Sequence, residues 1–147
     1  MIIDFVKVVE DAVIPTKGSK LSNGFDLYAS ESVMIDACGG RALVRTGIAV
    51  KMPEDFQNVF GFVTPRSGLA LKHGITVLNS PGLIDTDYTG EVGVILLNTS
   101  LESYFVNRGD KIAQLVFLEQ DAILSLNEVE TLEHTDRGSN GFGSTGR

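Results

Sequence analysis

The sequence predicts an all-β fold with one short helix, and three observations lead to that prediction. Short runs rich in Val, Ile, Leu and Phe recur along the chain, and clusters of Gly, Pro, Asn and Asp separate them. This pattern is typical of strands rather than of amphipathic helices. Glycine is frequent, with 16 residues among 147, as expected of a turn-rich protein. The strand spacing is that of a sandwich or barrel, and the length indicates one domain.

Six apolar runs are expected to form strands. They cover residues 2–9, 42–50, 57–64, 91–98, 102–107 and 111–120. Turn residues bound them: Gly40 precedes the second, Pro65 follows the third and Gly109 precedes the last. The run EVGVILLN at 91–98 is apolar at successive positions, so both faces of this strand need cover. It should lie in the middle of a sandwich or at a subunit interface.

The segment PRSGLALKHGI, residues 65–75, breaks the strand pattern and predicts a short helix. Ser67 is expected to cap the start of the helix, and Gly74 to end it in the left-handed conformation. A helix start offers free N–H groups, so Arg66 and Ser67 could form an anion site there. The alternative, given equal weight from the residues alone, is a capped connector whose arginine makes a surface ion pair.

Charge and composition exclude several functions. The net charge of −7 argues against stable binding to nucleic acid or to a membrane surface, since both need a cationic field. Cys38 is the single cysteine, so neither an internal disulfide nor a cysteine-based zinc site is expected. The first residues lack a signal-peptide pattern and no run approaches 18 apolar residues. We therefore expect a soluble, intracellular protein.

The segment NSPGLIDTDYTGE at 79–91 is expected to form a hairpin around a tight bend that includes Tyr88. Asp85 and Asp87 could bind a divalent ion, act as a general base, or simply be solvated turn residues. The apolar neighbours at 83–84 favour a functional role for Asp85, because a carboxylate in an apolar setting is more often functional.

Two further polar residues lie within apolar stretches. Gln114 is an amide among aliphatic neighbours, so it should either tie neighbouring backbone or contact a ligand. Asp26 follows Gly24 and would ordinarily make a turn hydrogen bond. The chain has no P-loop, no GxGxxG and no HExxH motif. An enzyme of this sequence that acts on phosphates would bind them without a P-loop.

The C-terminal stretch RGSNGFGSTG, residues 137–146, has the composition of a disordered tail. It nevertheless contains one cation, one aromatic ring and two hydroxyl groups, on Arg137, Phe142, Ser144 and Thr145. These are the groups that a phosphorylated ligand with a ring would need.

Five segments of the chain together resemble a known family. They are GFDLYA at 24–29, PRSGLALKHGI at 65–75, NSPGLIDTDYTGEVGVILLN at 79–98, RGDKIAQLVF at 108–117 and RGSNGFGSTG at 137–146. In this order and spacing they resemble the five motifs of the homotrimeric deoxyuridine triphosphatases (dUTPases). The resemblance extends over the whole chain, and five motifs are far more specific than any one of them.

The resemblance implies a distorted jelly roll of the β-clip type with one short helix, assembled as a homotrimer whose active sites are shared between chains. Residues 1–136 would form the β domain. Residues 137–147 would form a flexible glycine-rich tail that closes over an active site. The implied biological role is to limit uracil incorporation into DNA and to supply dUMP for dTMP synthesis.

The reaction implied by the resemblance is hydrolysis of dUTP to dUMP and diphosphate, by attack of water on the α-phosphorus. Asp85 would be the general base, which leaves Asp87 without a catalytic role. The implied cofactor is Mg²⁺, held mainly by the substrate phosphates and by water. Asp26 would reach this ion through a water molecule.

The resemblance also assigns substrate-binding residues. Asn79 and the backbone of Gly82, Leu83 and Ile84 would read uracil, while Tyr88 would pack on the deoxyribose and exclude a 2′-hydroxyl. Phe142 would stack on the uracil ring. The groups expected to hold the phosphates are Arg66, Ser67, Gly68, Gln114, Arg137, Gly143, Ser144 and Thr145. The chain departs from the usual family pattern at Asn23 and Asn140.

Two alternatives to a dUTP pyrophosphatase remain. The first is a family member that serves as a binding or signalling module with little activity, which the presence of Asp85, Tyr88, Arg137 and Phe142 disfavours. The second is a relative that also deaminates dCTP, which is disfavoured because no obvious deamination base accompanies Asp85.

Overall fold

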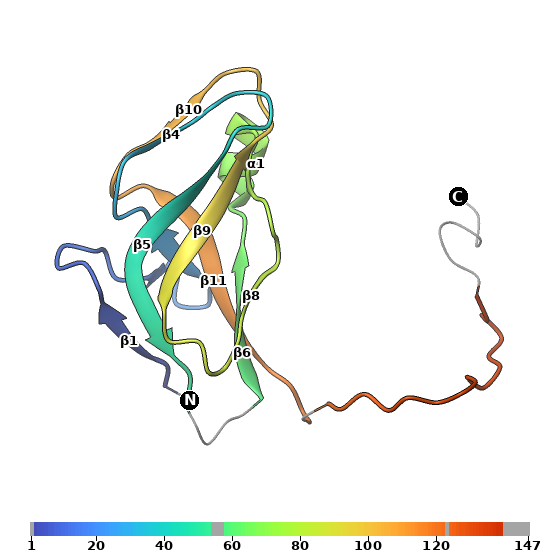
Figure 1. Cartoon of the computed structure of the whole chain (residues 1–147). Helices are drawn as coiled ribbons and strands as arrows, with labels where there is room; N and C mark the ends of the chain where they lie inside the picture. The colour runs from blue at the N-terminus through green and yellow to red at the C-terminus, as the bar shows by residue number, and fades with distance from the viewer. Residues whose placement is uncertain (1, 54–57, 123, 140–147) are drawn as a thin grey trace.

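The computed structural model describes residues 2–53, 58–122 and 124–139. In these residues the chain forms eleven strands and one helix, so the predicted all-β fold with one short helix is confirmed. One sheet contains, in spatial order, β1 (Asp4–Lys7), β5 (Arg41–Lys51), β9 (Glu91–Asn98) and β7 (Ile75–Val77). The second contains β2 (Thr16–Lys17), β3 (Phe25–Tyr28), β11 (Lys111–Glu119), β6 (Val59–Thr64) and β8 (Gly82–Ile84). β4 (Val33–Ile35) pairs with β10 (Tyr104–Val106) at one end of the molecule (Figure 1).

The core lies between the two larger sheets. Val94 of β9 is fully buried, as are Leu27 of β3 and Ala113 of β11. Every second residue of β9 faces this core, which is the alternation that a half-covered strand requires. Burial of these aliphatic side chains supplies most of the stabilisation of the fold, at about 25 cal/mol per Å² of apolar surface.

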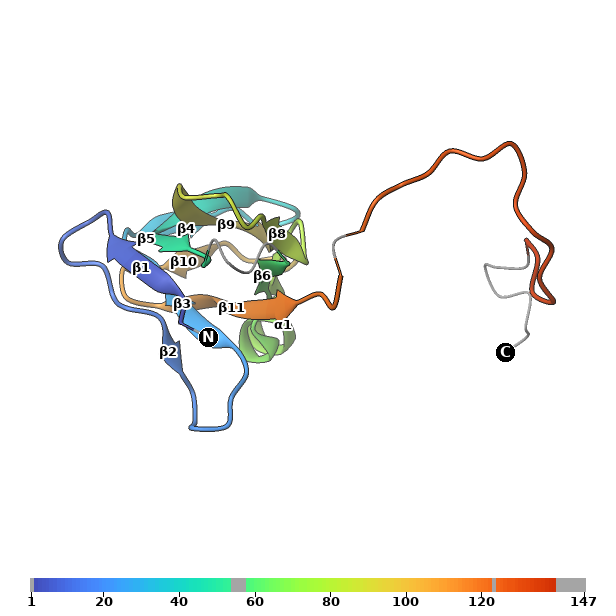
Figure 2. The same ribbon diagram turned by 90° about the horizontal axis from the view of Figure 1, so that it is seen from below.

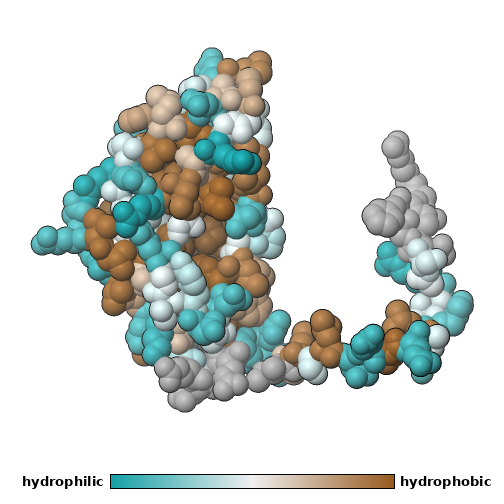
Figure 3. Space-filling model, in the orientation of Figure 1, coloured by the Kyte–Doolittle hydropathy of each residue, from teal (hydrophilic) through white to brown (hydrophobic). Residues whose placement is uncertain are grey.

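The other face of β9 is also apolar, as the run EVGVILLN predicted. Gly93, Ile95 and Leu97 of β9 alternate with the buried residues, and Ile95 is opposite Leu43 of β5. The side chain of Leu43 is 62% exposed. Figure 3 shows apolar side chains over the side of the molecule on which β5 and β9 lie. We call this surface, made by Leu43, Gly93, Ile95 and Leu97, the β5–β9 face.

The helix α1 (Ser67–His73) forms where the sequence predicted it, but its start differs from the prediction. Arg66 is the N-cap residue in an extended conformation, and no side chain caps the helix. The expectation that Ser67 caps α1 is therefore wrong, because Ser67 is already the first helical residue. Gly74 ends the helix with φ of 65°, as expected, and its N–H donates to the carbonyl of Ala70.

The predicted hairpin over residues 79–91 is wrong in its pairing. β8 pairs with β6, whereas β9 pairs with β5 and β7, so the two strands belong to different sheets. The segment therefore crosses from one sheet to the other. β8 is the last strand of its sheet in the described part of the chain, and one of its edges carries no strand partner there.

Beyond β11, the described residues up to 139 are exposed and run away from the sheets (Figures 1 and 2). The described part of the chain contains no helix with the length and apolar character that a membrane span requires.

Candidate active site

A buried carboxylate brings together residues from two strands and from the start of α1. Asp26 lies on β3, and its side chain is 5% exposed. Lys111 Nζ is 2.8 Å from Asp26 Oδ2, and Arg66 Nε is 3.4 Å from Asp26 Oδ1. Gln114 Nε2 donates to the same Oδ1 atom at 3.4 Å. We call Asp26, Arg66, Lys111 and Gln114 the Asp26 cluster.

Strand register explains why these side chains meet. β11 lies between β3 and β6, and Gln114 is opposite both Asp26 and Thr64. Arg66 follows two residues after Thr64, and its Nη1 donates to the carbonyl oxygen of Lys111 at 3.1 Å. Ser67 and Gly68 come next, at the exposed start of α1. The structure therefore places these predicted phosphate-binding residues around Asp26 or directly after it in the chain.

Lys111 is the member of the cluster that the sequence analysis missed. In a regular strand, residues three apart point to opposite faces. The pairing of β11 with β3 is irregular between Lys111 and Ala113, where one extra residue enters β11. The extra residue returns Lys111 to the same side as Gln114. The regular alternation of side chains along a strand could not reveal that Lys111 lies on the side of Gln114. The only signal in the sequence was the cation three residues before Gln114.

Charges within the Asp26 cluster stabilise one another. Burial acts to raise the pKa of Asp26, but the hydrogen bond from Lys111 and the charges of Lys111 and Arg66 outweigh it, so this pKa lies below its ordinary value. The hydrogen bond to Asp26 raises the pKa of Lys111. Two cations and one carboxylate leave one net positive charge, which suits a phosphate in a protein whose net charge is −7.

The second group of predicted residues lies around the turn after β8. The N–H of Tyr88 donates to the carbonyl oxygen of Asp85 at 3.1 Å, and the Thr86 hydroxyl donates to the carbonyl of Val59 at 2.6 Å. Asp85 itself is exposed. Asp85 borders a shallow cavity of about 230 Å³, which Leu83 and Thr86 also line. We call residues 85–88 the Asp85 turn.

The expected apolar setting of Asp85 is wrong for the single chain. Ile84 is 7% exposed and faces the core, whereas Leu83 is 58% exposed. The two apolar neighbours point to opposite faces of β8, as successive strand residues do, and the carboxylate that follows them reaches solvent.

The side chain of Tyr88, the last residue of the Asp85 turn, is held in place by its contacts with residues 90 and 91. Its hydroxyl donates to the carbonyl oxygen of Glu91 at 3.0 Å. A Cβ on Gly90 would lie 2.6 Å from that hydroxyl, so the tyrosine lies against the glycine backbone. The carboxylate of Glu91 accepts hydrogen bonds from Arg45, at 2.6 Å and 2.9 Å, and from the N–H of Gly47 at 2.7 Å. The position of the Tyr88 ring therefore depends on a glycine and on an anchored strand end.

Asn79 lies beside the start of β8. Its side-chain nitrogen would be 3.2 Å from a Cβ placed on Gly82, and Asn79 is exposed. The structure thus brings Asn79, in the turn between β7 and β8, next to Gly82, the first residue of the strand that leads to Asp85.

The Asp26 cluster and the Asp85 turn lie toward opposite ends of β6. Gln114 is opposite Thr64, whereas Ile84, the residue before Asp85, is opposite Gly61. Three residues along β6 and two strand spacings across the sheet separate the backbones of Gln114 and Ile84 by about 14 Å. Figure 1 shows α1 at one end of β6 and the start of β6 at the other.

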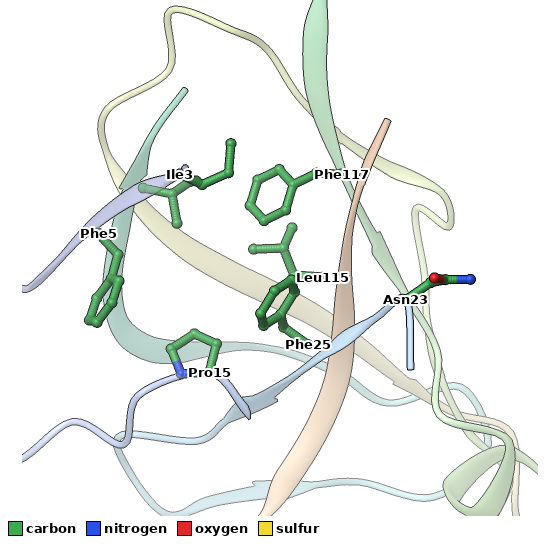
Figure 4. Close-up of a pocket in the computed structure, with 8 residues that line it drawn as sticks. Ile3, Phe5, Pro15, Asn23, Phe25, Leu115 and Phe117 are labelled. Carbon is green, nitrogen blue, oxygen red and sulfur yellow. The ribbon is translucent and has the colours of Figure 1, made fainter. Parts of the chain in front are cut away.

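A larger pocket elsewhere contains no predicted site residue. Its volume is about 360 Å³, and it opens between β1 and the sheet of β3 and β11. Figure 4 shows its lining residues, which are Ile3, Phe5, Pro15, Asn23, Phe25, Val50, Leu115 and Phe117. This lining is almost entirely apolar and has no charged group, so the pocket is unsuited to a phosphorylated ligand.

Within the described residues, Arg137 of the predicted tail is not brought to either group. Arg137 belongs to the exposed segment that runs away from the sheets. Phe142, Gly143, Ser144 and Thr145 lie outside the described residues, as does Asn140.

Comparison with known families decides the identity. A sequence model of the dUTPase family matches residues 10–146. The chain belongs to the dUTPase family. The matched residues include both the Asp26 cluster and the Asp85 turn.

Curated dUTPases of several organisms are similar to this chain over most of their length. The deoxyuridine 5′-triphosphate nucleotidohydrolase of Wolinella succinogenes is 50% identical over 147 residues, which are 100% of this chain and 95% of that protein. The enzyme of that name from Clostridium novyi is 46% identical, with 95% of each chain covered.

Solved dUTPase structures share the fold. A mutant of the dUTPase of Staphylococcus bacteriophage 80alpha with dUpNHpp has a TM-score of 0.86 at 26% identity, and 99% of each chain is covered. A mutant dUTPase from phage phi11 of S. aureus, in which a structural Mg(II) ion is coordinated, has a TM-score of 0.78 at 25% identity, covering 91% of this chain and 100% of that one.

The described residues of this dUTPase offer no preformed protein cage for a metal ion. Among them, no group of three or more His, Cys, Asp or Glu side chains converges. Asp26 is the predicted contact, and its two oxygens already have Lys111, Arg66 and Gln114 as partners. This donor set fits an ion whose ligands come mainly from a bound polyphosphate and water, with Asp26 at most in an outer position.

Proposed function

We propose that the protein is a dUTP nucleotidohydrolase that converts dUTP to dUMP and diphosphate. The observation that supports this most strongly is the match to the dUTPase family over residues 10–146, together with relatives of that activity at 45–50% identity. The protein would thereby limit uracil incorporation into DNA and supply dUMP for dTMP synthesis.

The Asp26 cluster supplies the phosphate-binding half of the site. Arg66 and Gln114 would donate to phosphate oxygens, and the N–H groups of Ser67 and Gly68 at the start of α1 would add to them. A Cβ on Gly68 would meet nothing within 4 Å, so the space beside this backbone is open to a ligand.

The Asp85 turn supplies the general base. The exposed carboxylate of Asp85 would accept a proton from water as the water oxygen bonds to the α-phosphorus. The bond from the α-phosphorus to the oxygen that bridges to the β-phosphorus breaks, and diphosphate leaves with that oxygen.

The base-binding part of the site would be formed by β8. Because one edge of β8 carries no strand in the described chain, its backbone N–H and C=O groups could pair with the edge of a uracil ring. Asn79 would extend this row of polar groups. Such buried polar pairing discriminates strongly against a base with a different pattern. Tyr88 would pack on the deoxyribose and exclude a 2′-hydroxyl.

We further propose that the active site is shared between chains of a homotrimer. The separation of about 14 Å between the backbones of Ile84 and Gln114 supports this, since a general base must come within about 3 Å of the water it activates. Asp85 of one chain would act on phosphates held by Arg66 and Gln114 of another. The β5–β9 face, with Leu43 62% exposed, gives apolar surface for such an assembly.

The tail and the metal ion complete the proposal. Residues 1–136 form the β domain, and the tail at 137–147 closes over an active site, with Phe142 on uracil and Arg137, Gly143, Ser144 and Thr145 near the phosphates. Mg²⁺ bound by the phosphates would neutralise negative charge as diphosphate leaves. Asp26 would contact its hydration shell.

A substrate-specificity assay tests the function. The full chain with Mg²⁺ should release diphosphate from dUTP and not from UTP, dTTP or dCTP. Binding of dUTP without turnover would instead indicate a binding module, and ammonia release from dCTP would indicate a deaminase. Light scattering tests the assembly, because an active monomer would contradict the shared site.

A further inference from the structure

A negative charge lies at the centre of the proposed phosphate-binding half of the site. Asp26 is 5% exposed and has Arg66 and Lys111 beside it. By itself a carboxylate repels a triphosphate. Burying it also costs free energy unless charged partners and hydrogen bonds compensate. A contact to a metal hydration shell does not account for the three side chains that already converge on its oxygens.

We propose that Asp26 is a positioning residue, which holds Arg66 and Gln114 in the orientation that binds the triphosphate. This inference rests on the proposed function, because it assigns to Arg66 and Gln114 the phosphates of dUTP.

Two contacts on different atoms fix the guanidinium of Arg66. Nε lies 3.4 Å from Asp26 Oδ1, and Nη1 donates to the carbonyl oxygen of Lys111 at 3.1 Å. Contacts at two atoms define the plane of the group, and a guanidinium has five N–H donors. In the described part of the chain, these contacts leave other donors of the same plane for phosphate oxygens. Since arginine loses rotamer freedom when it binds, prior fixation lowers the entropic cost of binding.

The amide of Gln114 is oriented by the same oxygen. A carboxylate only accepts hydrogen bonds, so Asp26 selects the nitrogen of Gln114, which donates to Oδ1 at 3.4 Å. Strand pairing fixes the backbone of Gln114 on both sides, opposite Asp26 and opposite Thr64. The side chain is thus held by the carboxylate while the sheet holds the main chain.

Lys111 compensates the negative charge of Asp26. The cluster therefore still attracts an anion while the carboxylate orients Arg66 and Gln114. Lys111 Nζ is 2.8 Å from Asp26 Oδ2, on the oxygen that Arg66 and Gln114 do not use. The cluster keeps one net positive charge, and the carboxylate screens the two cations from each other. The bulge in β11 is what brings Lys111 to this side.

Asp26→Asn tests the inference, because the substitution keeps the shape and removes the charge. The affinity of the full chain for dUpNHpp and for dUMP should be measured by calorimetry, with Mg²⁺ and again with EDTA. We expect dUpNHpp to bind about tenfold or more weakly in both conditions, while the affinity for dUMP changes little. Circular dichroism and light scattering check that the variant keeps its fold and assembly.

Each other outcome overturns the inference. A loss seen only with Mg²⁺ would assign Asp26 to the metal hydration shell, and an equal loss for dUMP would indicate general structural damage. Unchanged binding of dUpNHpp would show that Arg66 and Gln114 need no such support. If the unmodified chain failed to bind dUpNHpp, the proposed function itself would fail, which is a distinguishable result.

Two further variants keep the test decisive. Lys111→Gln removes a half-exposed partner and should weaken dUpNHpp by a smaller factor, because Arg66 and Gln114 still hold Asp26 Oδ1. If Asp26→Asn does not fold, unchanged binding in Lys111→Gln contradicts the inference.

Asp11→Asn is the matched control. It also removes an ion-paired carboxylate, the partner of Arg108, but this carboxylate lies outside the Asp26 cluster. It should leave both affinities unchanged.

Discussion

The Asp26 cluster and the Asp85 turn each contain an aspartate, and the two aspartates are held in opposite ways. Asp26 is buried, with two cations and an amide on its oxygens. Asp85 is exposed, and its turn is fixed through backbone contacts, at the carbonyl of Asp85 and at that of Val59. The first region is organised within one chain before any ligand arrives. The second presents its carboxylate to solvent in the single chain, and in the proposed assembly the substrate and another chain would surround it.

The difference follows from what each carboxylate would do. A positioning group keeps its charge, and ion pairs in a buried setting hold it there. A general base must accept a proton and release it during each cycle. Strong partners on Asp85 would hinder that exchange, so exposure in the single chain is consistent with its proposed role.

The largest expected effect comes from Asp85→Asn. The substitution removes the proton acceptor and should reduce kcat by about 10² to 10⁴, while KM changes little. Steady-state diphosphate release measures both parameters. A rate near that of the unmodified enzyme would remove Asp85 from the role of general base.

The next effect concerns assembly, which would join the two regions across chains. Leu43→Glu places a charge in the β5–β9 face and should lower the association constant by about 10² or more. Activity should fall in parallel while the far-ultraviolet circular dichroism of the fold persists. Light scattering and activity are measured at matched concentrations.

Leu101→Glu is the control for this prediction. Leu101 is 87% exposed and lies in the loop between β9 and β10, where it lines a pocket with Lys72 and Tyr104 rather than belonging to the β5–β9 face. A similar loss of assembly in both variants would show that the β5–β9 face has no special role.

A smaller effect is expected on the sugar side of the Asp85 turn. A Cβ in Gly90→Ala would lie 2.7 Å from Tyr88 Cζ, so the ring must move. We expect kcat/KM for dUTP to fall about tenfold, with weaker discrimination against UTP. Tyr88→Phe keeps the ring and removes only the hydrogen bond to Glu91, so it should change less. Equal behaviour of the two variants would contradict a steric role for the ring.

The smallest effect is on stability at acid pH. The pKa of Asp26 is lowered in the folded chain, because Lys111 and Arg66 outweigh the effect of burial. The stabilisation is therefore present above the unfolded pKa, about 3.9, and is lost as the pH falls through the lower folded value. In urea unfolding below about pH 4, Asp26→Asn should lose less stability than the unmodified chain. A steeper loss in the variant would contradict the ion pairing.

Much of the fold was predictable because burial alternates along long strands. The run at 91–98 revealed both its core face and its exposed apolar face. Short strands such as 16–17 and 82–84 were missed, since two or three residues carry no recognisable period. The pairing of β8 with β6 was also missed, because a partner about 20 residues away in the chain is not visible in local turn residues.

The candidate site was predictable in its membership and not in its contacts. Family motifs pointed to Asp26, Arg66 and Gln114. Nothing in the local sequence showed that Arg66 and Gln114 both contact the carboxylate of Asp26. Lys111 was missed because a bulge changes the face on which it lies. The apolar surroundings inferred for Asp85 failed because its two neighbours face opposite ways.

The position of β8 at the edge of its sheet has an evolutionary consequence. The hydrogen-bonding pattern along a strand edge belongs to the main chain, so it is the same whatever side chains the strand carries. If this edge reads the base, point mutations along β8 can weaken binding by disturbing packing, but few can redirect it to another base. Proline is the exception, because it deletes an N–H group. Selectivity for one base would then depend on the main chain of β8 and would persist through most substitutions of its side chains.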